Sequence, residues 1–158
     1  MSDKPLNVLF LCKHNTARSI IAEALLNRLG QGRFKAFSAG SNPSKDIHPY
    51  TVDLMKNMNY GLDGQAPKAM DTITEEMDFI FTVCDETSVE DCPAFNGEPM
   101  TANWEVPDPI KAEGTEAEKR LAFSEAYRML NNRISIFVNL PLTEDRAKLQ
   151  GQLNDIGT

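Results

Sequence analysis

Long hydrophobic runs are missing from this sequence, and its 158 residues include only three cysteines and two histidines. No segment approaches the ~20 apolar residues of a membrane-spanning helix. The first five residues and the short apolar run after them do not resemble a secretory signal. Three cysteines make a poor disulfide framework, and neither histidine lies near a C-x-x-C pair of the zinc-finger kind. We therefore expect a cytoplasmic protein with no membrane association, no metal and no cofactor.

Positive charge is also scarce, with 16 Lys and Arg against 23 Asp and Glu and a net charge of −7. An acidic chain with few basic clusters is a poor candidate for binding nucleic acid or an anionic membrane. If the protein binds an anion, it must do so in a locally positive pocket, because the net negative charge of the protein repels anions.

The apolar pattern alternates between short buried strands and amphipathic helices. Strands are expected at residues 6–11, 34–38, 79–83 and 101–106. Helices are expected at residues 17–29 and 49–58, and after a capping box at Thr115 and Glu118. This alternation predicts an α/β domain with a parallel sheet and helices on both faces. The length suits one domain, which we assign to residues 1–141, followed by a polar, weakly helical tail at 142–158.

Three chemically capable residues are expected at one edge of this sheet. Cys12 follows the first predicted strand, Cys84 follows the third, and Asp108 lies just past the fourth. Open parallel sheets bind ligands in the crevice at the carboxyl ends of their strands. These positions therefore predict an active site at that edge.

The segment from Cys12 to Ser19 has the composition of an oxyanion-binding loop between a strand and a helix. Its backbone N–H groups can form a cradle for a tetrahedral anion, and the Arg18 guanidinium can bind two oxygens. The same donors would lower the pKa of the Cys12 thiol and make it a nucleophile. Asn15 tolerates a left-handed backbone, small residues let the loop curl, and the Ser19 hydroxyl can reach the sulfur. The candidate oxyanion-binding residues are Lys13, His14, Asn15, Thr16, Ala17, Arg18 and Ser19. The side chain of His14 is interpreted as exposed, and that of Lys13 as adding only local positive charge.

Each of these residues also has a simpler interpretation. Cys12 can be a buried cysteine at a strand end, because cysteine is among the most buried residue types. Asp108 can be the general acid for a leaving oxygen or an aspartate in a turn between two prolines. Cys84 and Cys92 can form a redox pair or can be one packed and one incidental cysteine. The residues alone leave these alternatives open.

Several short motifs, in order along the chain, resemble the arsenate reductases built on the low-molecular-weight tyrosine phosphatase fold. The resemblance covers roughly residues 6 to 138 and is more specific than any single motif. The matching stretches are LCKHNTARS, SAG at Ser38–Gly40, HP at His48–Pro49, TVCD at Thr82–Asp85, CP at Cys92–Pro93, WEVPDP at Trp104–Pro109, and AEGTEAEKRLAF from Ala112 to Phe123.

The resemblance implies a four-stranded parallel sheet in the flavodoxin-like order 2-1-3-4 and a relay of three cysteines. Cys12 would attack arsenate, held by Arg18 and the loop amides, while Asp108 protonates the departing water. Cys84 would attack the adduct and release arsenite, and Cys92 would then attack Cys84. Thioredoxin would reduce the final disulfide, with glutathione, glutaredoxin or mycothiol as alternatives. Seven residues separate Cys84 from Cys92, where six are usual in the family.

The family resemblance also covers a potassium site behind the loop. Asn15, Glu23 and Ser38 match three of its ligand positions, but Lys68 replaces the acidic fourth ligand. We therefore expect no potassium, and the Lys68 ammonium could take the cation's place.

Two other functions compete with arsenate reduction. A tyrosine phosphatase would use Cys12, Arg18 and Asp108 but would not need the other cysteines, and weak phosphatase activity could accompany the reductase. Ile110 stands where tyrosine phosphatases usually carry an aromatic residue beside the acid. A non-catalytic oxyanion sensor is the third possibility, and the intact set of candidate residues counts against it.

Overall fold

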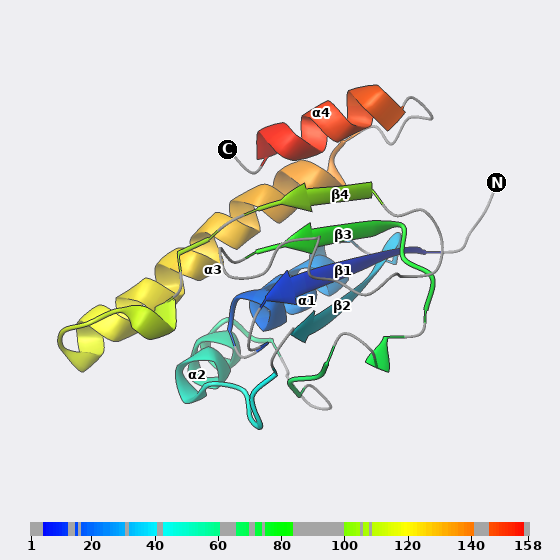
Figure 1. The fold of residues 1–158 in the computed structure, drawn as a ribbon. Coiled ribbons are helices and arrows are strands. Elements are labelled where there is room, and N and C mark those ends of the chain that lie inside the picture. The colour runs from blue at the N-terminus through cyan, green and yellow to red at the C-terminus, as the bar shows by residue number, and fades with distance from the viewer. Residues whose placement is uncertain are drawn as a thin grey trace.

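A computed structural model describes residues 5–12, 15, 17–30, 32–40, 43–60, 66–69, 72–73, 75–83, 100–104, 106–107, 109–140 and 146–156. Strands and helices alternate in the first half of the chain, and the second half is dominated by one long helix (Figure 1). The elements in chain order are β1 (Leu6–Cys12), α1 (Arg18–Leu29), β2 (Phe34–Gly40), α2 (Pro49–Asn57), β3 (Phe79–Thr82), β4 (Met100–Asn103), the 3-10 helix η3 (Pro109–Lys111), α3 (Glu116–Val138) and α4 (Arg146–Ile156).

The four strands form one parallel sheet in the order β2-β1-β3-β4, which confirms the predicted class and order. In the register of the sheet, Cys12 pairs with Gly40 and Leu11 pairs with Thr82. The strand predicted at residues 101–106 is shorter, because β4 ends at Asn103. Trp104 and Val106 still donate to the carbonyls of Thr82 and Val83, and Pro107, which has no N–H, cannot donate in the same way.

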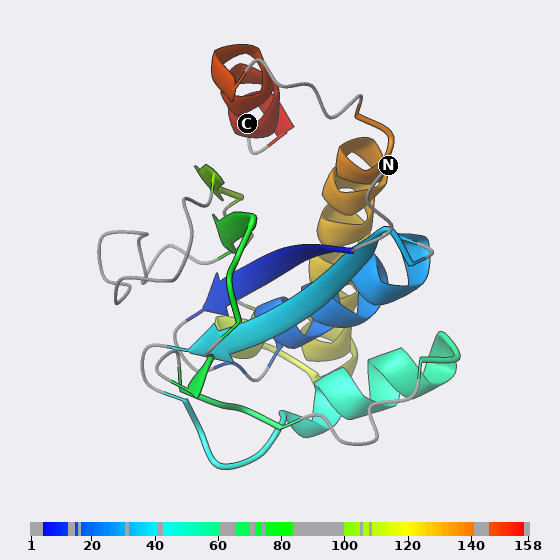
Figure 2. The same cartoon turned by 90° about the vertical axis from the view of Figure 1, so that its right-hand side faces the viewer.

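Apolar side chains form a large cluster on one face of the sheet and a small one on the other. The large cluster combines strand residues with residues of α1, α3 and α4, and α1 and α3 lie on the same side of the sheet in Figure 2. On the opposite face, the small cluster joins residues of β1, β2 and β3 to Ile73 and Met77. Within the described residues, helices therefore pack on one face, and the segment before β3 contributes to the other. The predicted helices on both faces are thus not seen in this part of the chain.

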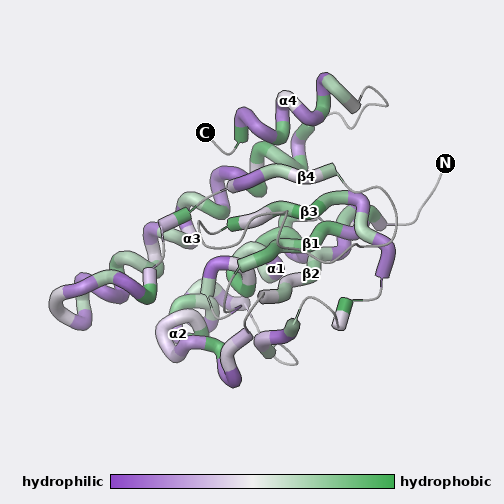
Figure 3. Tube along the Cα trace, in the orientation of Figure 1, coloured by the Kyte–Doolittle hydropathy of each residue, from purple (hydrophilic) through white to green (hydrophobic). Residues whose placement is uncertain are grey.

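The longest helix, α3, starts where the sequence predicts. The Thr115 hydroxyl accepts a hydrogen bond from the Glu118 N–H at 3.2 Å, and the Glu118 carboxylate accepts one from the Thr115 N–H at 3.4 Å. This confirms the capping box. Hydrophobic and hydrophilic positions alternate along α3 in Figure 3, as expected for a helix that buries one face. Phe123, Leu130 and Phe137 lie on that buried face.

The segment described from sequence as a tail contributes to the core. Residues 146–156 form α4, and Leu149, Leu153 and Ile156 belong to the large apolar cluster. The Trp104 indole N–H donates to the Leu153 carbonyl at 2.9 Å, which fixes α4 beside the end of β4. Helix α4 lies along the outer side of β4 in Figure 1 and helps to cover this edge strand.

Among the described residues, none of the helices has the length and apolar character that crossing a membrane requires.

Candidate functional site

Cys12 ends β1 at the carboxyl edge of the sheet, and its side chain is buried, with 4% exposed. Helix α1 begins six residues later at Arg18, with Ala17 at its N-cap. Alanine has no side-chain acceptor for the N–H groups of the first helical turn, and that turn carries no acidic residue. A helix N-terminus of this kind favours a bound anion.

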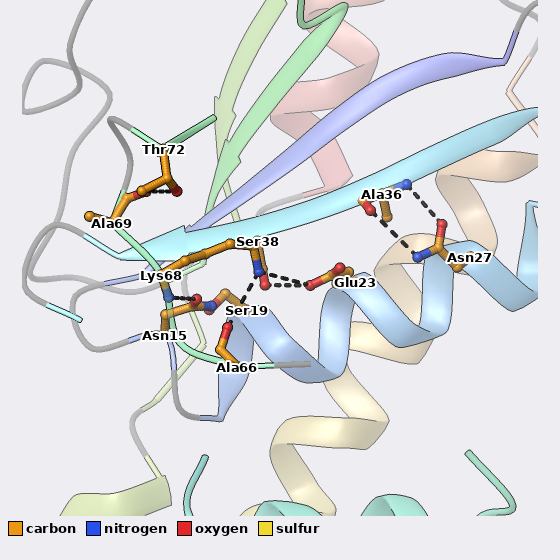
Figure 4. Close-up of polar contacts among 10 residues, drawn as sticks. All are labelled: Asn15, Ser19, Glu23, Asn27, Ala36, Ser38, Ala66, Lys68, Ala69 and Thr72. Atoms are coloured by element: carbon orange, nitrogen blue, oxygen red, sulfur yellow. Dashed lines mark hydrogen bonds and ion pairs between the residues drawn. The ribbon is translucent and has the colours of Figure 1, made fainter. Parts of the chain in front are cut away.

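Asn15 gives the loop its shape. Its φ of 54° is the left-handed conformation that asparagine tolerates, as the sequence analysis anticipated. The buried amide of Asn15 accepts from the Lys68 N–H at 2.9 Å and donates to the Ser19 hydroxyl oxygen at 2.7 Å (Figure 4). These two bonds fix the turn against a neighbouring segment, and they orient the Ser19 hydroxyl for donation to a further acceptor.

A charged group lies behind the loop, where the sequence resemblance located a cation. The Ser38 hydroxyl donates to the carboxylate of Glu23, and the Lys68 ammonium lies 3.9 Å from the same Glu23 oxygen (Figure 4). Glu23 is buried with 8% exposed, so a cationic partner offsets part of its desolvation cost. A potassium ion bound beside Glu23 would therefore lie next to the Lys68 ammonium, which would repel it.

Arg18 reaches across the carboxyl edge of the sheet. Its buried guanidinium, in a residue 3% exposed, donates from Nη1 to the Val106 carbonyl at 2.9 Å. The Val106 N–H donates to the Val83 carbonyl at 3.1 Å, and the Val83 N–H donates to the Leu11 carbonyl at 3.0 Å. A continuous set of hydrogen bonds therefore joins the ends of β1 and β3, the segment after β4, and Arg18.

Several predicted site residues lie outside the described residues, but residues next to Cys84 and Asp108 in the sequence are described. Val83, which precedes Cys84, is bonded to the residue before Cys12. Pro107 and the buried Pro109 flank Asp108 at the same edge. The predicted residues that lie outside are Lys13, His14, Thr16, Cys84, Cys92 and Asp108.

Sequence reasoning did not anticipate a cavity of about 340 Å³ beside Pro109. His48, which precedes the N1 proline of α2, caps that helix because its Nδ1 accepts from the Tyr50 N–H at 3.1 Å. A polar residue before an N1 proline is a sequence signal that could have identified His48 as a cap. The cavity is lined by His48, Pro49, Tyr50, Pro109, Ile110, Lys119 and Phe123.

Comparison with protein families matches residues 7–148 to the model of the low molecular weight phosphotyrosine protein phosphatases. The arsenate reductase of Oceanobacillus iheyensis is 28% identical over 131 residues, which cover 82% of this chain and 93% of that protein.

Solved structures with similar folds include two arsenate reductases. The enzyme from Archaeoglobus fulgidus has 28% identity and a TM-score of 0.65, with 84% of this chain and 99% of that chain covered. The thioredoxin-dependent enzyme from Corynebacterium glutamicum has 26% identity and a TM-score of 0.61. That match covers 85% of this chain, which spans only 60% of the Corynebacterium chain.

Proposed function

We propose that this chain, which belongs to the low molecular weight phosphotyrosine protein phosphatase family, reduces arsenate to arsenite. The observation that carries this proposal is the hydrogen-bonded set Leu11–Val83–Val106–Arg18 at the carboxyl edge of the sheet. It supports the proposal because it joins residues that precede Cys12, Cys84 and Asp108 in the sequence, the proposed nucleophile, second cysteine and acid. The arsenate reductases among its relatives favour arsenate as the substrate.

In the first step, the Cys12 thiolate attacks arsenic and forms a sulfur–arsenic bond. Arg18 and the N–H groups of residues 13–19 stabilise the oxyanion, and the N-terminus of α1 favours both negative charges. Asp108 gives its proton to a departing arsenic hydroxyl, which leaves as water. The product is a covalent Cys12–arsenate adduct.

The second step is the reduction. The Cys84 thiolate attacks the Cys12 sulfur, the sulfur–arsenic bond breaks, and its electron pair passes to arsenic, which leaves as arsenite. Cys92 then attacks Cys84, which frees the Cys12 thiolate and leaves a Cys84–Cys92 disulfide. A dithiol reductant, with thioredoxin as the first candidate, takes the oxidising equivalents from this disulfide. The cycle consumes two electrons and needs no bound cofactor.

Replacing Cys84 by serine tests the relay. We expect Cys84→Ser and Cys92→Ser each to abolish arsenate-dependent NADPH oxidation in an assay with thioredoxin and thioredoxin reductase, because neither serine can form a disulfide. Hydrolysis of a small aryl phosphate should survive both changes, since it needs only the nucleophile, the oxyanion loop and the acid. Full arsenate reduction by Cys84→Ser would show that the relay is wrong.

The family match also favours a second candidate, a phosphatase that acts on phosphotyrosine. It would use Cys12, Arg18 and Asp108 in the same way, but Cys84 and Cys92 would have no role in the reaction. Ile110 follows the Asp108–Pro109 pair, and it gives an aromatic substrate a smaller partner than an aromatic side chain would. Efficient phosphotyrosine hydrolysis without arsenate reduction would favour this candidate.

Replacing Lys68 by methionine tests the ammonium behind the loop. Because Glu23 would lose its cationic partner, we expect the free energy of unfolding to fall by about 1 kcal/mol, after allowance for partial exposure. Potassium should then stabilise the variant but not the wild type when it replaces sodium at constant ionic strength. Thermal unfolding in both salts measures this, and Lys56→Met on α2 is the control. If potassium stabilised the wild type specifically, the proposal that the Lys68 ammonium takes the place of a cation would be wrong.

A further inference from the structure

We propose that Arg133 is a positioning residue for the general acid, because it anchors the segment that leads from β4 to Asp108. This inference rests on the proposed role of Asp108. Arg133 lies on α3, and its Nη1 donates to the Trp104 carbonyl at 3.2 Å. The two residues are 29 positions apart, so no local sequence pattern could have singled out this contact.

The anchor is one of several that hold the same short segment. The Trp104 N–H donates to the Thr82 carbonyl at 2.7 Å, and the Val106 N–H donates to the Val83 carbonyl at 3.1 Å. On the acceptor side, the Trp104 carbonyl receives Arg133 and the Val106 carbonyl receives Arg18. Two arginines, Arg18 from α1 and Arg133 from α3, therefore bind the two carbonyls of this segment that β3 does not bind.

The two prolines on either side of Asp108 limit the backbone freedom of the chain after Val106. Val106 and Asp108 each precede a proline in the sequence, and a following proline disfavours the helical backbone region. Pro107 and Pro109 have φ fixed near −65° by their rings. Few backbone rotations are left between the anchored Val106 carbonyl and the buried Pro109, at which η3 begins. A displacement at Trp104 that reaches the Val106 carbonyl would therefore be passed on toward Asp108.

Catalysis is sensitive to such a displacement. A general acid works only within hydrogen-bond reach of the oxygen it protonates, and a misplacement of about 1 Å can cost on the order of 100-fold in rate. Arg18 still holds the Val106 carbonyl when Arg133 is lost, so the displacement should be partial. We expect Arg133→Met to lower kcat/KM for arsenate about tenfold and to leave the affinity for inorganic phosphate within about twofold.

A double-mutant cycle separates positioning from a general structural effect. If Arg133 acts through Asp108, Arg133→Met should cost about tenfold in the wild-type background and less than about twofold in Asp108→Asn. The control is Arg128→Met on the same helix. Arg128 is exposed and paired with Glu125 at 2.7 Å, so its loss removes an equal charge without touching the segment. Arg133→Lys, which keeps one donor and the charge, should recover part of the rate and serves if the methionine variant does not fold.

Hydrogen exchange gives a readout that does not depend on activity. The Val106 amide should exchange faster in Arg133→Met than in the wild type and Arg128→Met, because its bond to Val83 opens more often. Equal losses of kcat/KM in both backgrounds, or unchanged exchange at Val106, would overturn the inference. If Asp108→Asn alone leaves the rate unchanged, the proposed acid is wrong, and the exchange of Val106 then decides whether the anchor exists.

Discussion

Cys12→Ser is expected to abolish both arsenate reduction and aryl phosphate hydrolysis, with a fall in rate of roughly 10⁴-fold or more. A serine hydroxyl has nearly the shape of the thiol, but its much higher pKa leaves it un-ionised beside the N-terminus of α1. Because both reactions begin with attack by the same atom, both should be lost together. Rates with arsenate and with an aryl phosphate, measured on the same preparation, check this expectation.

Phosphate binding separates the loss of the nucleophile from damage to the site. Arg18 stays bonded to the Val106 carbonyl, and Asn15 stays bonded to Lys68 and Ser19. Inorganic phosphate should therefore raise the melting temperature of Cys12→Ser at least as much as that of the wild type. Substantial catalysis by a Cys12→Ser variant that binds phosphate would refute Cys12 as the nucleophile.

Phe137→Ala is expected to lower the free energy of unfolding by about 3–5 kcal/mol, a large share of the stability of a typical domain. Phe137 is fully buried, and its ring centroid lies 5.0–5.7 Å from those of four other aromatic side chains. These contacts join α3 to β2, to β3 and to the end of β4, so truncation leaves a cavity where three parts of the fold meet. The four neighbours are Phe34, Phe79, Phe81 and Trp104.

Urea unfolding can be followed by the fluorescence of Trp104, the single tryptophan, which is fully buried. The matched control is Ile136→Ala at the adjacent position of α3, where the side chain is 52% exposed. That change should stay within about 0.5 kcal/mol, because it removes little buried area. Similar losses for the two variants would mean that α3 packs through a different face.

Local patterns predicted much of the architecture. The capping box of Thr115 and Glu118, the N1 proline at Pro49 and the buried strands are local signals, and each is present in the structure. The strand predicted at residues 101–106 was too long, because Trp104 and Val106 are apolar although β4 ends at Asn103. The last 17 residues were predicted to be a polar tail, yet three of their apolar side chains belong to the core. No local pattern shows this, because these side chains are buried by contact with β4 and α3.

The sequence by itself determined the order of strands and helices, the position of Cys12 before a helix N-terminus, and the left-handed tolerance of Asn15. These follow from propensities that act over a few residues. Only the tertiary structure decided that the Arg18 guanidinium binds the Val106 carbonyl and that Arg133 reaches Trp104. Such contacts join residues far apart in the chain, and their geometry is set by packing of the helices on the sheet, which no local pattern encodes.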